Sequence, residues 1–142
     1  MRDQATTPRC TETLLLRVAK PIQMRIWTVA MYDPHSDPWS VRLLASGGLS
    51  VSPTTPLAKG CYWTISRDLL AAGCIARVGC REQLVIGPVA GHFVRIAQGP
   101  TVAHTQAKRL STFLDRTYAV VAAGTENTWA DADRAAAALM PA

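Results

Sequence analysis

The sequence is dominated by short β-prone segments that are separated by breaks containing glycine or proline. These segments are rich in Leu, Val, Trp and other strand-favouring residues, and the acidic, proline-rich stretch at 33–38 predicts a tight turn. The predicted strands are residues 12–19, 23–32, 41–45, 61–65, 83–86 and 92–98, with 87–91 as a hairpin turn. A turn at Gly99-Pro100 leads into a last β-prone stretch, 101–104.

Helical signals enter only after the fourth predicted strand. Ser66 as an N-cap, Asp68 in the first turn and Gly73 at the end predict one or two helical turns. After Thr105, a predicted N-cap, apolar side chains recur at three- and four-residue steps and predict an amphipathic helix. These side chains are Ala107, Leu110, Phe113, Leu114 and Thr117. A capping-box-like start at 128–131 predicts a final helix, which a proline ends.

Together these elements predict an α+β fold: an antiparallel sheet or open barrel of short strands, a short mid-chain helix and two C-terminal helices. With 142 residues, of which 49% are hydrophobic and 18% charged, we predict a single compact domain over residues 1–142. We expect residues 1–11 to be disordered and residues 46–60 to form a variable loop. No apolar run approaches the length of a membrane span or secretion signal, which favours a cytoplasmic protein.

The familiar signatures of nucleotide-binding and hydrolytic enzymes are missing from the sequence. The close carboxylate pairs at 33/37 and 131/133 are explained by turn and helix-start chemistry. The cysteines lack metal-ligand spacing, so we interpret them as reduced, semi-buried thiols. We therefore predict no catalytic residue, cofactor or metal. An enzyme would need a pocket that brings His92 or His104 to an acid and a nucleophile.

A net charge of +5 keeps a nucleic-acid partner under consideration. Residues 13–32 contain Arg17, Lys20 and Arg25 without an acid, and Trp27 lies in the same predicted hairpin. The alternative function is therefore a single-stranded nucleic-acid-binding module with a basic, Trp-containing sheet face. The other interpretation, which we favour, places Trp27 in the core beside a solvated arginine face. Trp39, Trp63 and Trp129 are likewise interpreted as packing residues.

Four groups of residues resemble, in the same order, the SsgA/SsgB-like sporulation and cell-division proteins of actinobacteria. The first group is Tyr32, Asp33, Asp37, Pro38 and Val41, and the second is Trp63, Arg67, Asp68, Leu69, Leu70, Ala71 and Gly73. The third is Phe113, Leu114, Asp115, Arg116 and Thr117, and the fourth is Gly124, Thr125, Glu126, Asp131 and Asp133. The blocks Arg-Asp-Leu-Leu-x-x-Gly and Phe-Leu-x-Arg-Thr are the more specific.

The resemblance implies a compact α+β domain similar to the Whirly-type fold, a homotrimer and no enzymatic activity. It implies a protein recruited to the division septum that acts by contact in septum placement, division-ring assembly or peptidoglycan remodelling. Its implied partners are division-ring proteins, cell-wall synthesis proteins and other SsgA-like proteins. Arg67 and Asp68 are interpreted either as a structural helix start or as partner contacts, with structure favoured. Gly124 is similarly expected to reverse the chain, and Trp63 and Leu70 to be core.

Overall fold

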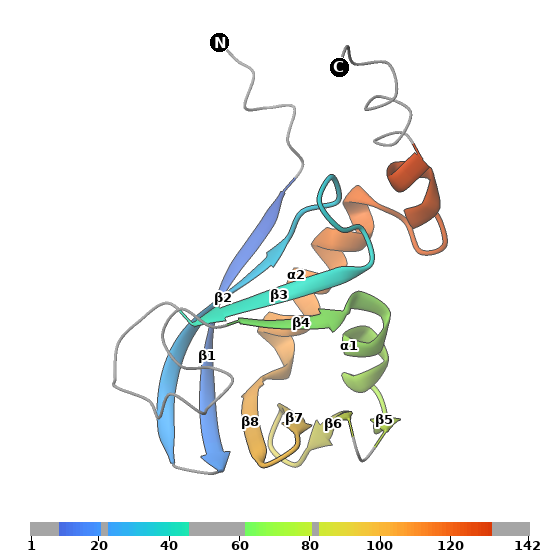
Figure 1. Cartoon of the computed structure of the whole chain (residues 1–142). Helices are drawn as coiled ribbons and strands as arrows, with labels where there is room; N and C mark the ends of the chain where they lie inside the picture. The colour runs from blue at the N-terminus through green and yellow to red at the C-terminus, as the bar shows by residue number, and fades with distance from the viewer. Residues whose placement is uncertain (1–8, 21–22, 46–61, 81–82, 132–142) are drawn as a thin grey trace.

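The computed structural model describes residues 9–20, 23–45, 62–80 and 83–131, and they form one curled antiparallel sheet with helices packed against it (Figure 1). The order across the sheet is β4-β3-β2-β1-β8-β7-β6-β5. The strands are β1 (Cys10–Lys20), β2 (Met24–Tyr32), β3 (Ser40–Ala45), β4 (Tyr62–Ser66), β5 (Val78–Cys80), β6 (Leu84–Val89), β7 (Phe93–Gln98) and β8 (Thr101–Gln106). The predicted α+β class and antiparallel sheet are confirmed.

Alternation along the strands separates a buried face from an outer face. In β1, Leu14, Leu16 and Val18 are buried, whereas Arg17 between them is exposed. The helix α2 (Ala107–Val120) covers the buried face with Leu110, Phe113, Leu114 and Thr117, the positions that the periodicity predicts. The short helix α1 (Arg67–Gly73) begins at Ser66, whose side chain accepts a hydrogen bond from the Leu69 amide, as predicted.

Two predicted boundaries are wrong at the N-terminal and central strands. Cys10 and Thr11 pair with Tyr32 and Met31 in β1, so the expected disorder does not extend to them. Residues 87–89 belong to β6 and not to the hairpin turn, because they pair with β7. Pro88 is tolerated there because β5 pairs only with residues 84–86 and leaves β6 unpaired on that side. The loop at 46–60 lies outside the described residues.

Two predicted helix starts are also wrong. Thr105 does not cap α2. It lies in β8, where it pairs with Val94 of β7, and its hydroxyl donates to the Leu15 carbonyl at 3.2 Å. Pairing with a distant strand therefore overrides the local capping preference. The C-terminal helix starts at Glu126, two residues before the predicted start at Thr128. Thr128 already lies inside the helix, and its amide donates to the Thr125 carbonyl at 3.0 Å. The structure describes this helix as far as Asp131.

Gly73 of α1 packs directly against Ile86 of β6, and this contact yields a testable prediction. A Cβ at this position would lie 2.2 Å from Ile86 Cγ2 and 2.7 Å from Ile86 Cβ. We expect Gly73→Ala to lower the free energy of unfolding by about 1–3 kcal/mol, because the new methyl group must displace a buried side chain. Denaturant unfolding measures the loss. The same substitution should cost less in an Ile86→Ala background, and an equal cost in both backgrounds would contradict this packing account.

Candidate interaction site

The resemblance motifs converge on the buried guanidinium of Arg67, whose side chain is 0% exposed at the start of α1. Its guanidinium carbon lies 5.0 Å from the Tyr32 ring centre and 4.0 Å from the Tyr118 ring centre. The two rings come from β2 and α2, so the cation links the sheet to both helices. We call Arg67, Tyr32, Tyr118, Thr117 and Glu126 the Arg67 cluster.

Hydrogen bonds tie Arg67 to the end of α2 and to the segment that follows it. One terminal nitrogen, Nη1, donates to the carbonyl oxygens of Thr117 at 3.0 Å and Val121 at 2.8 Å. The other, Nη2, donates to Glu126 Oε2 at 2.5 Å, and this carboxylate is itself buried. A buried charge is stable only when it is paired and hydrogen-bonded, so this geometry fixes the position of residue 126.

The surroundings of the cluster set its protonation states. Burial raises the pKa of Tyr32 to about 12, and burial together with the hydrogen bond to Asp68 raises that of Tyr118. Burial alone would raise the pKa of Glu126, but hydrogen bonds from the backbone and from Arg67 prevail and lower it. At neutral pH the cluster therefore holds one ion pair between two uncharged phenols.

The lowered pKa of Glu126 predicts how stability depends on pH. A carboxyl group with a lower pKa in the folded state stabilises the protein above its unfolded pKa, near 4.5, and the stabilisation is lost as the pH falls through the folded value. We expect the stability advantage of the wild type over Glu126→Gln to be largest near neutral pH and to shrink below pH 4.5. Denaturant unfolding measured from neutral to acidic pH tests this, and a pH-independent difference would contradict it.

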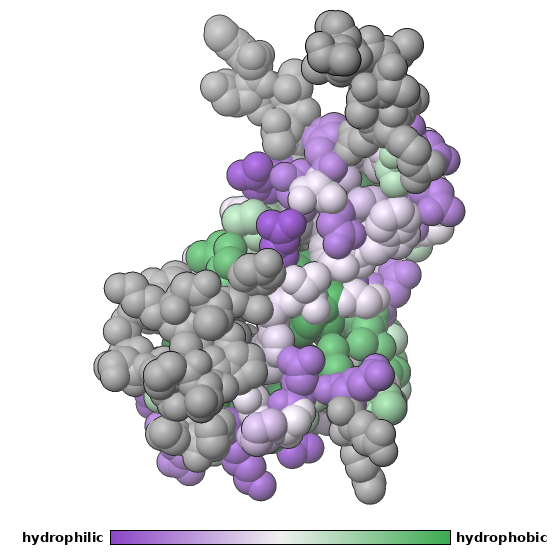
Figure 2. Space-filling view, viewed as in Figure 1, coloured by the Kyte–Doolittle hydropathy of each residue, from purple (hydrophilic) through white to green (hydrophobic). Residues whose placement is uncertain are grey.

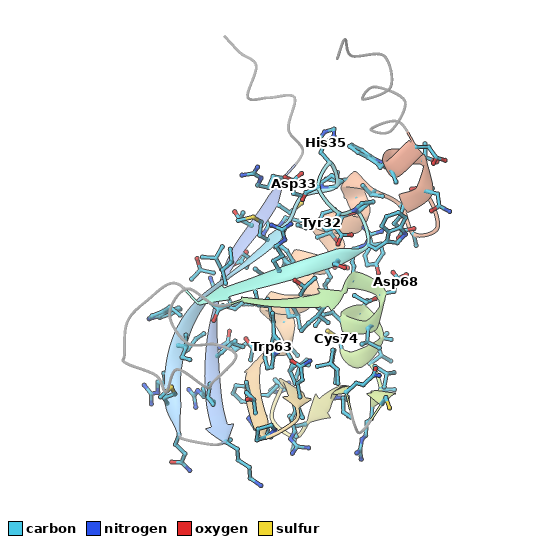
Figure 3. All side chains as sticks on the ribbon, viewed as in Figure 1. Tyr32, Asp33, His35, Trp63, Asp68 and Cys74 are labelled. Carbon is cyan, nitrogen blue, oxygen red and sulfur yellow. The ribbon has the colours of Figure 1, made fainter. Side chains whose placement is uncertain are left out.

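Four of the predicted motif residues hold the turn between β2 and β3, and Figure 3 labels two of them, Tyr32 and Asp33. The Tyr32 hydroxyl donates to the Pro38 carbonyl at 2.8 Å, and the Asp33 carbonyl accepts from the amides of residues 36 and 37. The Asp37 carboxylate accepts from the Trp39 amide at 2.9 Å. The turn therefore holds Trp39, whose side chain is 45% exposed, so its interpretation as a packing residue is wrong.

The helix α1 lies beside this turn, because the Arg67 amide donates to the Trp39 carbonyl at 2.8 Å. Leu70 and Gly73 lie on the buried side of α1, and Leu69 of the same helix is half-buried against the core. Asp68 (labelled in Figure 3) is exposed, and it accepts a 2.5 Å hydrogen bond from Tyr118. Hydrophobic surface gathers over α1 (Figure 2), and just after the helix Ile75 is 83% exposed.

The remaining motif residues have structural contacts. Phe113 and Leu114 are in the core, and so are Trp63 and Leu70, as the sequence predicts for these two residues. The Trp63 indole donates a hydrogen bond to the Gln98 side chain. The Thr117 hydroxyl donates to the Leu114 carbonyl at 2.7 Å. Arg116 is exposed on α2 and donates to the Thr11 carbonyl at 2.8 Å and to Glu12 at 2.9 Å.

Gly124 and Thr125 shape the corner between α2 and Glu126. Gly124 has a φ of +85°, a conformation that favours glycine, and it turns the chain toward Arg67. The Thr125 hydroxyl donates to the Ala122 carbonyl at 2.6 Å. The expected chain reversal at Gly124 is thus in place, and the corner carries Glu126 into the Arg67 cluster.

The residues predicted for the alternative nucleic-acid face also lie together. Arg17 pairs with Arg25, and Leu15 with Trp27, on the outer face of β1 and β2. A bulge in β1 after Val18 pairs Lys20 with Val102, on the same side as Arg17. Trp27 is 52% exposed, so the favoured interpretation of it as a core residue is wrong. Arg95, His104 and Phe93, which the sequence pattern did not suggest, join this face from β7 and β8.

Two observations bear on catalytic and metal chemistry in the described part of the chain. Within residues 9–20, 23–45, 62–80 and 83–131, no three His, Cys, Asp or Glu side chains gather to hold a metal ion. Among the same residues, no acid or nucleophile lines the two hollows beside His104.

Burial raises the pKa of the Cys10 and Cys74 thiols, whereas Cys80 is exposed and departs from the predicted semi-buried state. No helix in the described ranges is long and apolar enough to cross a membrane.

Comparison with known proteins gives this arrangement its context. A sporulation-specific cell division protein SsgB of Saccharopolyspora erythraea is 31% identical over 99% of this chain and 97% of its own length. An SsgA-like sporulation-specific cell division protein from Thermobifida fusca has a solved structure with a TM-score of 0.77 and 26% identity, covering 99% of this chain and all of that one.

A second solved structure concerns SsgB and longitudinal cell division during sporulation of Streptomyces coelicolor. It has a TM-score of 0.70 and 26% identity and covers 87% of this chain and 96% of that one. The family model for SsgA, the Streptomyces sporulation and cell division protein, matches residues 26–126, which include Tyr32, Arg67, Thr117 and Glu126. The chain therefore belongs to the SsgA family of sporulation and cell division proteins.

Proposed function

We propose that this protein is a non-enzymatic adaptor that acts at the sporulation septum by holding division-ring or cell-wall synthesis proteins. It works in the cytoplasm and is recruited to the septum, where it contributes to septum placement, ring assembly or peptidoglycan remodelling. Membership of the SsgA family supports the role in sporulation and division. The adaptor mechanism rests on the geometry around α1.

One observation carries the adaptor proposal. The motif residues hold α1 and the turn beside it in place through hydrogen bonds and buried contacts. Two large apolar side chains, Trp39 and Ile75, remain exposed near the two ends of α1. We call Trp39 and Ile75 with the exposed side of α1 the α1 face. Tryptophan is enriched among residues that dominate binding energy, and the backbone of Trp39 is already held by hydrogen bonds, so less chain entropy is lost on binding. The α1 face therefore suits a protein partner better than a small substrate.

We further propose that the protein forms a homotrimer and also associates with other SsgA-like proteins. The resemblance to SsgA-like proteins carries this part of the proposal, and a closed ring of three copies needs two different surfaces on each copy. The mass of the purified protein in solution tests this part. A mass three times that of the chain is expected, and a monomer at all concentrations would contradict it.

Capture from sporulating cells tests the adaptor proposal. The purified full chain is immobilised, and proteins retained from the lysate are identified by mass spectrometry and compared with those retained by Trp39→Ala. Retention of a division-ring or wall-synthesis protein by the wild type, and its loss with Trp39→Ala, would support the proposal. Identical retention by the two proteins, or retention of no such protein, would contradict it.

A further inference from the structure

The outer face of the sheet carries a row of basic side chains that crosses four neighbouring strands. Arg25 on β2 lies opposite Arg17 on β1, Arg17 lies opposite His104 on β8, and His104 lies opposite Arg95 on β7. We call these four residues the arginine row. Because adjacent strands are about 4.8 Å apart, the row spans about 14 Å. All three arginines are exposed, and His104 is half-buried.

A second row of side chains runs parallel to the arginine row. Its members lie two residues away along each strand, so the two rows are about 7 Å apart. Trp27 lies opposite Leu15, and Phe93 lies opposite Gln106 and Val89. We call Trp27, Leu15, Gln106, Phe93 and Val89 the aromatic row. The Arg17 guanidinium lies 5.7 Å from the Phe93 ring centre and joins the two rows. A hollow of about 120 Å³ between them is lined by Leu15, Arg17, Trp27 and Phe93.

The charge of this face has one sign. Among the described residues, neither row contains an aspartate or glutamate, and the neighbouring acid Glu12 is paired with Arg109 and Arg116 of α2. Burial and the adjacent Arg95 lower the pKa of His104, so the three arginines supply the charge at neutral pH. Hollows of about 360 and 300 Å³ beside Arg17 and His104 leave room for a ligand along the row.

We propose that this face binds single-stranded nucleic acid, with phosphates along the arginine row and bases stacked on Trp27 and Phe93 of the aromatic row. Proteins that bind single strands without sequence preference combine a basic track with aromatic platforms, and the two rows place these side by side. An acidic protein segment would use only the arginine row. A second copy facing the first would bring like charges together. This activity is separate from the α1 face and does not depend on the adaptor proposal.

Fluorescence anisotropy of the purified full chain with labelled oligodeoxythymidine of about 15 nucleotides tests the proposal. We expect binding that weakens with salt, with a slope of log K against log salt of about −0.7 for each phosphate neutralised. Arg17→Ser should weaken binding about tenfold and flatten the slope by about 0.7. Arg17→Lys should retain the slope. Trp27→Ser should weaken binding about tenfold with the slope unchanged, because it removes stacking and not charge.

Matched controls separate this face from general charge and from aromatic content. Lys108→Ser removes an exposed cation from α2, and Trp39→Ser removes an exposed tryptophan from the turn before β3; both should bind like the wild type. No binding at low salt would overturn the proposal. Equal competition by polyglutamate at the same charge concentration would overturn it in favour of an acidic protein segment. An affinity unchanged in Trp27→Ser would also overturn it, since only charge would then be recognised.

Discussion

Replacing Arg67 with methionine should lower the free energy of unfolding by about 3–5 kcal/mol at neutral pH. The substitution leaves Glu126 as a buried carboxylate without its ion-pair partner and leaves the carbonyls of Thr117 and Val121 without their side-chain donor. Methionine approximates the volume of the arginine stem, so most of the loss comes from these uncompensated polar groups. We also expect residues 121–131 to become accessible to proteases, because Arg67 ties this segment to α1.

Urea denaturation of the variant and of two companions measures this effect. Arg109→Met removes an exposed ion pair with Glu12, at 3.4 Å, and should cost only about 0–1 kcal/mol. The double variant Arg67→Met/Glu126→Gln should recover part of the loss, because no charge is then left buried alone. A cost for Arg67→Met as small as that of Arg109→Met would contradict the assignment of Arg67 as the organising residue. If Arg67→Met does not fold, Glu126→Gln alone still tests the pair.

Replacing Trp39 with alanine should weaken binding of the captured division partner about 30-fold, which corresponds to about 2 kcal/mol. The side chain is 45% exposed, while the backbone around it is held by Asp37 and Arg67. The substitution should therefore leave the free energy of unfolding within about 0.5 kcal/mol of the wild-type value. Isothermal titration with the purified partner measures the affinity, and urea denaturation measures the stability.

Trp27→Ala is the matched control for this prediction, because Trp27 is a comparably exposed tryptophan on the outer sheet face. It should bind the protein partner like the wild type. If both tryptophan variants lose affinity equally, the α1 face is not a specific contact. If Trp39→Ala loses stability as well as affinity, Trp39 is a structural residue and the adaptor surface lies elsewhere.

The fold was predictable where local pattern and tertiary context agree. The strands of the β1–β2 hairpin follow from their residues, and α1 from Ser66 and Gly73 at its ends. The three-residue strand β5 is too short to give a periodic signal. Local sequence places Pro88 in a turn and Thr105 at a helix start, whereas both residues pair with β7 in the folded chain, which local sequence does not show.

The candidate site was predictable as a set of residues and not as a geometry. Arg67 and Glu126 both belong to the resemblance motifs, yet they are 59 positions apart, so their ion pair appears only in the folded chain. The exposure of Trp27 and Trp39 was missed for a different reason. A tryptophan in a strand or turn has the same local pattern on either side of a sheet, and the position of α2 decides which side becomes core.

Site-specific photo-crosslinking in sporulating cells tests directly whether the α1 face makes the functional contact. A photoreactive phenylalanine derivative is placed at Trp39 and, in a separate strain, at Trp27, and the crosslinked products are identified by mass spectrometry. We expect position 39 to crosslink to a division-ring or wall-synthesis protein and position 27 not to do so. No such product from position 39 at normal protein levels, or the same product in equal amount from position 27, would contradict this expectation.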